Sequence, residues 1–234
     1  MSLQEITLPA NGPLAALPMV AELPAGARRG VVVLHEVFGR QPEIDRVVQR
    51  FAAQGWAAVA PDLYGDRLKP LCIREILQAI ATGRGPQVDQ VQRARDWLTA
   101  QTGIPPERMA VIGFCMGAGL ALAVGPNFAA TSSNYGDVPS TEVLQGLGPT
   151  IGCYGGRDRV FARSPAKLRT TLERLQVPHE VHVYDEVGHS FLTDGHHPVA
   201  SFLSKPLMQI EYKPAVAEAA WAKILAFLEG HVGA

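Results

Sequence analysis

A cysteine stands at the centre of a short motif bounded by glycines, Gly113-Phe114-Cys115-Met116-Gly117. The motif has the form G-x-nucleophile-x-G and lies between a segment typical of a strand and one typical of a helix. Such a sharp turn strains its central residue, and it needs both glycines because a Cβ there would strike the neighbouring strand and helix. The thiol would then stand at the N-terminus of the next helix, where unpaired N–H groups can bind an oxyanion. Cys115 is therefore the candidate nucleophile; the alternative is a small buried hydrophobic residue in a glycine-rich turn.

Two further residues follow the cysteine in the order acid, then base. Asp158 comes just after a predicted strand at 150–154, and His189 follows a predicted strand at 180–184. The carboxyl ends of parallel strands lie at one edge of a sheet, so these side chains should meet there. A nucleophile, an orienting carboxylate and an imidazole base, in that chain order, are typical of α/β-hydrolases. The alternative for Asp158 is a turn carboxylate that caps a helix at Ser164.

The other histidines and cysteines lack such a context. Histidines expected to be solvated or buried in the core are His35, His179, His182, His196, His197 and His231. Cys72 and Cys153 are expected to be small buried residues. Three cysteines without a C-x-x-C pair fit a reducing cytoplasm better than a disulfide framework or a zinc site.

The segments that must position these residues alternate between short apolar runs and stretches of helical period. Strands are predicted at 31–34, 56–60, 109–113, 129–133, 150–154 and 180–184. Helices are predicted at 42–54, 88–98, 117–124, 164–175 and 216–227, and a further helix follows the loop at 61–71 and ends at 81. This alternation predicts an α/β fold of the α/β-hydrolase type, with a mostly parallel central sheet flanked by helices on both faces. Residues 188–214 form the longest stretch without a clear period.

Composition limits the classes of partner. The 234 residues suit a single α/β domain over 1–234, and 47% apolar against 18% charged residues argues for a large core. The 21 Lys and Arg nearly balance the 22 Asp and Glu without runs, so neither nucleic acid nor a membrane is an expected partner. Neither a membrane span nor a leader sequence is recognisable, which favours a cytoplasmic monomer or small homo-oligomer.

Four short segments spread along the chain carry a further likeness. They are His35-Glu36-Val37-Phe38-Gly39, Ala60-Pro61-Asp62-Leu63-Tyr64, Gly113-Phe114-Cys115-Met116-Gly117 and Gly188-His189-Ser190-Phe191. Together, from about residue 17 to residue 228, they resemble the dienelactone hydrolase family, α/β-hydrolases with a cysteine nucleophile. The resemblance implies that Cys115, Asp158 and His189 cleave a small-molecule ester or lactone through a thioester acyl-enzyme.

The same resemblance implies roles for residues around the cysteine. Glu36 would be a switch that keeps the resting thiol protonated and receives its proton when substrate binds, consistent with repulsion between a carboxylate and a thiolate. The oxyanion hole would be the backbone N–H groups of Val37 and Met116. The residues expected to contact substrate are Tyr135, Ser190 and Phe38. The alternatives are an exposed loop residue for Glu36 and ordinary packing for Tyr135.

The sequence departs from the family where a substrate carboxylate would bind. Members that act on dienelactone carry an arginine shortly after the histidine segment, and here Leu192, Thr193 and Asp194 follow. Candidates for a second family arginine are Arg67, Lys69, Arg74 and Arg84. The stretch expected to roof the pocket offers instead Phe191, Leu192, Phe202 and Leu203 beside His196 and His197. An unpaired charge is costly to bury, so we expect a preference for an uncharged or larger ester or lactone over dienelactone.

Other functions stay open on the residues alone. A broad carboxylesterase or thioesterase would use the same three side chains. A noncatalytic binding protein or a thiol redox sensor would share the fold without needing both Asp158 and His189. Gly39 replaces the second histidine of an H-E-x-x-H zinc motif, and residues 113–119 match neither a dinucleotide fingerprint nor a phosphate loop. No cofactor and no metal are therefore expected.

Overall fold

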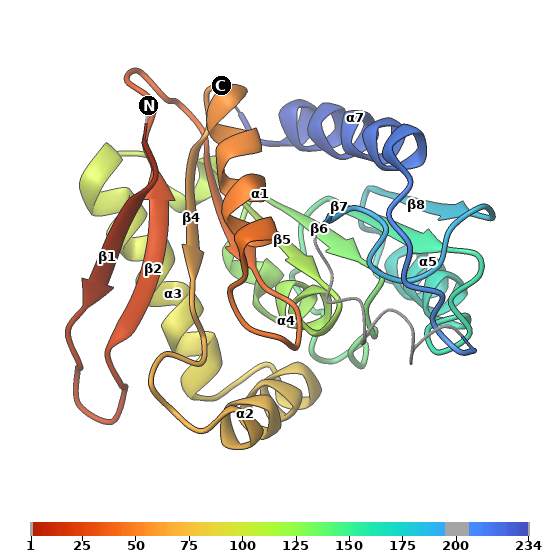
Figure 1. The fold of residues 1–234 in the computed structure, drawn as a ribbon, viewed down its shortest axis with the longest axis horizontal. Coiled ribbons are helices and arrows are strands. Elements are labelled where there is room, and N and C mark those ends of the chain that lie inside the picture. Colours follow the sequence, from red (N-terminus) through yellow and green to blue (C-terminus); the bar gives the residue numbers. More distant parts are fainter. Residues whose placement is uncertain (1, 195–205, 234) are drawn as a thin grey trace.

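One sheet of eight strands runs through the described residues, 2–194 and 206–233, of this computed structural model (Figure 1). The strands are β1 (Gln4–Leu8), β2 (Leu17–Glu22), β3 (Gly30–Leu34), β4 (Ala57–Pro61), β5 (Met109–Phe114), β6 (Ala130–Asn134), β7 (Thr150–Gly155) and β8 (His179–Tyr184). They lie in the order β1-β2-β4-β3-β5-β6-β7-β8. β2 pairs antiparallel with both β1 and β4, and the other neighbours pair in parallel. The expected mostly parallel sheet is confirmed.

Helices cover both faces of this sheet (Figure 1). One face carries α1 (Pro42–Ala53) and α7 (Pro214–His231), and the other carries α2 (Lys69–Thr82), α3 (Pro86–Thr102), α4 (Met116–Val124) and α5 (Ser164–Arg174). Two 3₁₀ turns, η1 (Pro106–Arg108) and η2 (Gly125–Asn127), precede β5 and β6. Along β3, Val31 and Val33 pack toward α1 and α7, whereas Val32 and Leu34 pack toward α3 and α4, as the period of two in a strand requires. Among the described helices, none has the length and apolarity to cross a lipid bilayer.

Local sequence explains where α2 and α3 begin and end. Both have a proline in the first turn, where the missing N–H is not needed. Each ends at a glycine in the left-handed region, Gly83 at φ 67° and Gly103 at φ 73°. The helices and parallel strands of the structure begin and end within a few residues of the ranges predicted from the sequence.

The antiparallel pair β1 and β2 is absent from the sequence-based prediction. β1 is mostly exposed at the edge of the sheet, so it has no apolar run, and β2 contains Pro18. Pro18 is the second residue of β2 and pairs with Thr7 of β1, so the missing N–H falls near the start of the strand. A strand pair of this kind carries little periodicity for sequence to reveal.

The parallel strands bring the candidate functional residues to one edge of the sheet. β3 ends just before Glu36, β5 just before Cys115, and β6 just before Tyr135. β7 and β8 end a few residues before Asp158 and His189. All five loops therefore leave the carboxyl edge, which is where parallel α/β sheets bind ligands.

Candidate active site

The turn at Cys115 has the strained geometry that its motif predicts. Cys115 lies between β5 and α4 with φ 53° and ψ −117°, outside the usual regions for a residue with a side chain. A Cβ on Gly113 would come within 2.0 Å of the Gly117 carbonyl oxygen, and one on Gly117 within 2.6 Å of the carbonyl oxygens of Leu34 and His35. Both glycines are required because the contacts are with backbone atoms.

The three cysteines differ in exposure. Cys115 is half-buried, whereas Cys72 and Cys153 are completely buried, as expected for small core residues. Burial raises the pKa of the Cys153 thiol to about 12, so it stays protonated at neutral pH. Cys115 is thus the cysteine that is partly exposed to solvent.

Asp158 and His189 form a buried hydrogen-bonded pair. His189 Nδ1 lies 2.6 Å from Asp158 Oδ2, and the two side chains are 2% and 3% exposed. The other carboxylate oxygen, Oδ1, accepts the backbone N–H groups of Val160 at 3.0 Å and Phe161 at 3.2 Å. With Nδ1–H donated to the carboxylate, Nε2 is left as the nitrogen that can exchange a proton.

The alternative for Asp158, a cap on the following helix, is not what the structure has. α5 begins at Ser164, and the residue before it, Arg163, makes no side-chain capping bond. Asp158 instead closes the turn that leads to Phe161. One carboxylate therefore both stiffens its own loop and orients the imidazole.

Two aromatic rings hold the imidazole of His189 in place. Phe161 stacks on it with ring centroids 5.3 Å apart and planes 21° apart. Tyr135 meets it edge to face at 5.0 Å. Nε2 is buried and makes no well-formed hydrogen bond within the described part of the chain. The ring is thus fixed on several sides while its second nitrogen remains available.

The charge on His189 is coupled to that on Cys115. Burial lowers the pKa of His189, but the negative charge of Cys115, the hydrogen bond that His189 donates to Asp158 and the charge of Glu36 outweigh it and raise the pKa to about 10. An imidazolium is therefore favoured when the sulfur is a thiolate. The proton can pass between the two groups as one shared proton.

Glu36 is a buried carboxylate, so the alternative of an exposed loop residue is wrong. Its side chain is 3% exposed, and Oε1 accepts hydrogen bonds from the Tyr135 hydroxyl at 3.2 Å and the Thr193 hydroxyl at 3.4 Å. Tyr135 itself is completely buried, and burial with the nearby charge of Glu36 raises its pKa well above the usual value. Tyr135 thus remains a hydrogen-bond donor to Glu36 at neutral pH.

His35 fixes the backbone of Glu36 from the other side. His35 Nδ1 donates to the Glu36 carbonyl oxygen at 2.7 Å, and Nε2 accepts the Leu63 N–H at 3.1 Å. Burial lowers the pKa of His35, so the ring is neutral and both bonds fit one tautomer. The expectation that His35 is a core histidine is confirmed.

The two candidate oxyanion donors come from adjoining backbone segments. Met116 is the first residue of α4, and Val37 lies in the loop after β3, where its carbonyl oxygen accepts the Tyr64 hydroxyl at 2.7 Å. Gly117 packs directly on the carbonyl oxygens at the end of β3, which brings the start of α4 against this loop. Phe38, the next residue in the loop, is 45% exposed, whereas Ser190 is buried with φ 55°.

A backbone segment that the sequence does not predict joins the acid and base loops. The Met208 carbonyl oxygen accepts the His189 N–H at 2.8 Å, and the Leu207 carbonyl oxygen accepts the Arg159 N–H at 2.8 Å. A Cβ on Gly188 would come within 2.2 Å of the Met208 oxygen. Gly188 is therefore needed for this close approach and not for a left-handed conformation, because its φ is not positive.

A model of the dienelactone hydrolase family matches residues 17–232. The chain belongs to the dienelactone hydrolase family. Membership makes it a hydrolase of the dienelactone hydrolase type, as the four sequence segments predict.

Relatives in the family are distant but cover most of the chain. A "Putative carboxymethylenebutenolidase" of Yersinia pestis is 28% identical over 212 residues, 81% of this chain and 79% of the relative. The carboxymethylenebutenolidase of Rhodococcus opacus is 26% identical over 225 residues, 85% of this chain and 84% of the relative.

Solved structures share the fold. The dienelactone hydrolase-like promiscuous phosphotriesterase P91 from metagenomic libraries has a TM-score of 0.78 at 21% identity, covering 99% of both chains. The dienelactone hydrolase of Anabaena variabilis has a TM-score of 0.67 at 20% identity, covering 97% of this chain and 99% of that one. Pyrococcus horikoshii acylaminoacyl peptidase, at 12% identity, matches 99% of this chain but 42% of its own, with a TM-score of 0.69. The fold is that of the α/β-hydrolases.

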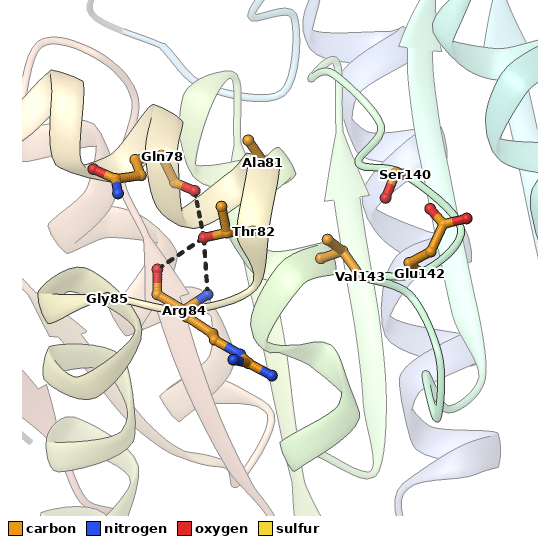
Figure 2. A pocket seen from close by; sticks show the side chains of 8 residues that line it. All are labelled: Gln78, Ala81, Thr82, Arg84, Gly85, Ser140, Glu142 and Val143. Atoms are coloured by element: carbon orange, nitrogen blue, oxygen red, sulfur yellow. Dashed lines mark hydrogen bonds between the residues drawn. The ribbon is translucent and has the colours of Figure 1, made fainter.

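Basic residues named as candidates for a dienelactone hydrolase carboxylate site have different surroundings. Arg67 forms a bidentate pair with Glu75 at 2.8 and 2.5 Å. Lys69 Nζ donates to the Phe38 carbonyl oxygen at 3.3 Å, beside the loop of Val37. Arg84 lines a hollow of about 680 Å³ that contains none of the candidate site residues, and Glu142 stands across from it (Figure 2). Arg74 is exposed.

The expected apolar roof is only partly described. Phe191 and Leu192 lie in the core beneath α7, where Trp221 Nε1 donates to the Leu192 carbonyl oxygen at 3.0 Å, so they are not a pocket wall. Phe202, Leu203, His196 and His197 lie outside the described residues.

Proposed function

We propose that this chain hydrolyses a carboxylic ester or lactone with Cys115 as nucleophile, His189 as base and Asp158 as the residue that orients the base. The observation that carries the proposal is the 2.6 Å hydrogen bond between His189 and Asp158 at the sheet edge where the strained turn presents Cys115. The names of the family and of its relatives support the same bond type. This combination serves acyl transfer and has no use in a passive binding protein.

In the first half of the reaction the thiolate forms the acyl-enzyme. Cys115 Sγ attacks the substrate carbonyl carbon while His189 Nε2 takes the thiol proton. The carbonyl oxygen becomes an oxyanion and accepts the N–H groups of Val37 and Met116. When the intermediate collapses, the ester C–O bond breaks, and His189 returns its proton to the leaving alkoxide. In a lactone the alcohol stays attached to the same molecule.

In the second half water replaces the thiol. His189 takes a proton from a water molecule, which attacks the thioester carbonyl carbon, and the C–S bond breaks as the sulfur recovers a proton from His189. The products are the carboxylic acid and the free enzyme. Asp158 keeps the Nδ1 proton in place throughout, so Nε2 alone exchanges protons.

Glu36 regulates the resting thiol in this proposal. Its carboxylate is buried beside Tyr135 and Thr193, the charges of Glu36 and Cys115 both act on Tyr135 and His189, and like charges repel. A carboxylate held there favours the neutral thiol until the substrate carbonyl arrives. Cys115 is then protected from oxidation between turnovers.

A substrate panel tests the activity and its scope. The wild type, Cys115→Ala and the control Cys72→Ala are assayed with aryl esters, lactones and acyl thioesters. The control removes a buried cysteine that has no part in the proposed mechanism. We expect turnover of esters or lactones that Cys115→Ala abolishes and Cys72→Ala retains. Turnover of thioesters alone would indicate a thioesterase, and turnover that survives in Cys115→Ala would contradict the proposal.

A further inference from the structure

A second hollow lies beside the catalytic imidazole, between the loop after β6 and the loop after β7. Its volume is about 380 Å³, and its walls include Asp137, Arg159, Phe161, Arg163 and Lys167. Both loops leave the carboxyl edge of the sheet, the same edge as Cys115 and His189. The hollow is therefore on the side of the molecule where a parallel α/β sheet binds ligands.

Two contacts connect this hollow to the reacting groups. Phe161 lines it and stacks on the His189 ring at 5.3 Å. Asp137 lines it too, and the preceding residue, Gly136, lies so close to the turn that a Cβ there would come within 2.4 Å of the Cys115 carbonyl oxygen. Phe161 is thus shared between the wall of the hollow and the surroundings of the imidazole.

The hollow carries an excess of positive charge. Arg159, Arg163 and Lys167 are exposed, and within the described residues none of the three forms an ion pair with a carboxylate. Lys167 Nζ donates to the Val138 carbonyl oxygen, which holds the ammonium at the wall. Asp137 is the one acidic side chain in the lining, and its Oδ1 already accepts the Val138 N–H at 2.8 Å. Three cations against one carboxylate attract an anion.

The backbone that carries these cations is fixed. The Arg159 N–H is bonded to the Leu207 carbonyl oxygen, and the Lys167 N–H to the Arg163 carbonyl oxygen in the first turn of α5. Asp158 holds the turn between them through Val160 and Phe161. The hydrogen bonds that orient Asp158 therefore also fix the backbone from which the three cationic side chains extend.

We propose that this hollow binds a carboxylate on the substrate, remote from the reacting carbonyl, and so selects esters or lactones with an acidic arm. The proposal rests on the proposed function and specifies its substrate class. Guanidinium groups suit carboxylates because they can donate two parallel hydrogen bonds. The residues after His189 and those at 67–84 favour an uncharged or larger substrate, and a larger substrate with a distant carboxylate agrees with them and with the cations of the hollow.

Paired substrates test this selectivity. The 4-nitrophenyl monoester of glutaric acid carries a free carboxylate, and its primary amide analogue has nearly the same shape without the charge. We expect wild-type kcat/KM to favour the acid by about tenfold, with an advantage that shrinks at high salt. The triple variant Arg159→Gln, Arg163→Gln, Lys167→Gln should bring the ratio of acid to amide close to one.

The control variant is Arg169→Gln. Arg169 is an exposed arginine on α5, the helix of Lys167, and its side chain donates to the Val181 carbonyl oxygen at 3.0 Å. It does not line the hollow. It should keep the wild-type ratio. A wild-type ratio near one, or a ratio that the triple variant leaves unchanged, would overturn the proposal.

Binding separates this proposal from the chemistry. Calorimetry of Cys115→Ala with monobenzyl glutarate and with its amide measures the preference without turnover. Tighter binding of the acid, lost when the three cations are replaced, supports the site. It does so even if the wild type hydrolyses neither ester, because that result would contradict only the proposed function. Equal binding of acid and amide would overturn the site.

Discussion

At the scale of single residues, the imidazole of His189 is the most constrained group in the candidate site. Its Nδ1–H is bonded to Asp158, and its ring stacks on Phe161 and makes an edge-to-face contact with Tyr135. The backbone N–H of His189 donates to the Met208 carbonyl oxygen. Such restraint suits a group that must give and take a proton at one position. It also means that Asp158 and His189 act as a unit with Cys115.

The first prediction follows from this unit. Asp158→Asn and His189→Ala should each lower kcat by about a thousandfold or more. The kcat of the double variant should be little below that of the less active single variant, because either change already removes the oriented base. Steady-state kinetics on one aryl ester checks this. Independent, multiplying losses, or a single variant with wild-type turnover, would show that the two residues are not a catalytic pair.

The second prediction concerns Glu36. In Glu36→Gln the hydrogen bonds from Tyr135 and Thr193 can persist while the negative charge is gone, so the thiolate of Cys115 should be less disfavoured. Alkylation by iodoacetamide at neutral pH should be faster than in the wild type. The control is Glu173→Gln, at an exposed position of α5. Equal alkylation rates across pH in all three proteins would place Glu36 outside the thiol's influence.

The third prediction is a pH titration. When the sulfur of Cys115 is a thiolate, its charge helps to raise the pKa of His189 to about 10, whereas burial lowers it. Removing the sulfur in Cys115→Ala should therefore move the His189 titration to lower pH, with the imidazolium lost earlier as pH rises. NMR of the labelled imidazole gives the midpoint directly. A midpoint that stays the same or rises would mean that the two groups do not share a proton.

At the scale of elements, close backbone approach decides the geometry of the site. The start of α4 lies on the end of β3 through Gly117, and the loop before His189 lies on residues 208–209 through Gly188. These contacts depend on the absence of a Cβ and not on the flexibility of glycine. Stability and site geometry are therefore coupled at these positions.

The fourth prediction compares two glycines. Gly117→Ala forces a Cβ to 2.6 Å from two backbone oxygens and should lower the free energy of unfolding by about 2–4 kcal/mol. Gly230→Ala, near the end of α7 with open space around the added Cβ, should be neutral or stabilising by about 0.5–1 kcal/mol. Urea unfolding of both variants checks the contrast. Similar effects at the two positions would contradict the close packing of α4 on β3.

At the scale of the whole molecule, sequence predicts what is local or periodic. Buried runs such as 109–113 and helical stripes such as 42–54 predict the parallel strands and their helices, and the loop positions then predict that Asp158 and His189 meet. β1 and β2 have weak periodicity because one is exposed and the other contains Pro18.

Contacts made by distant backbone are harder to predict. Nothing in the order of residues indicates that Met208 bonds to His189, that Thr193 bonds to Glu36, or that Phe161 stacks on the imidazole. These contacts depend on how loops of different strands lie across one another. The excess of cations beside Phe161 has the same origin, since Arg159 lies in the loop after β7, whereas Lys167 lies in α5.

Intact mass with peptide mapping of rapidly quenched enzyme shows whether Cys115 carries the acyl group. Wild type mixed with an excess of aryl ester should gain the mass of one acyl group, located on Cys115 alone and lost on treatment with hydroxylamine, because a thioester intermediate forms before water attacks. In His189→Ala the same adduct should form far more slowly. An acyl group on Cys72, Cys153 or Ser190 would show that Cys115 is not the nucleophile. The absence of any adduct, with turnover that persists in Cys115→Ala, would show the same.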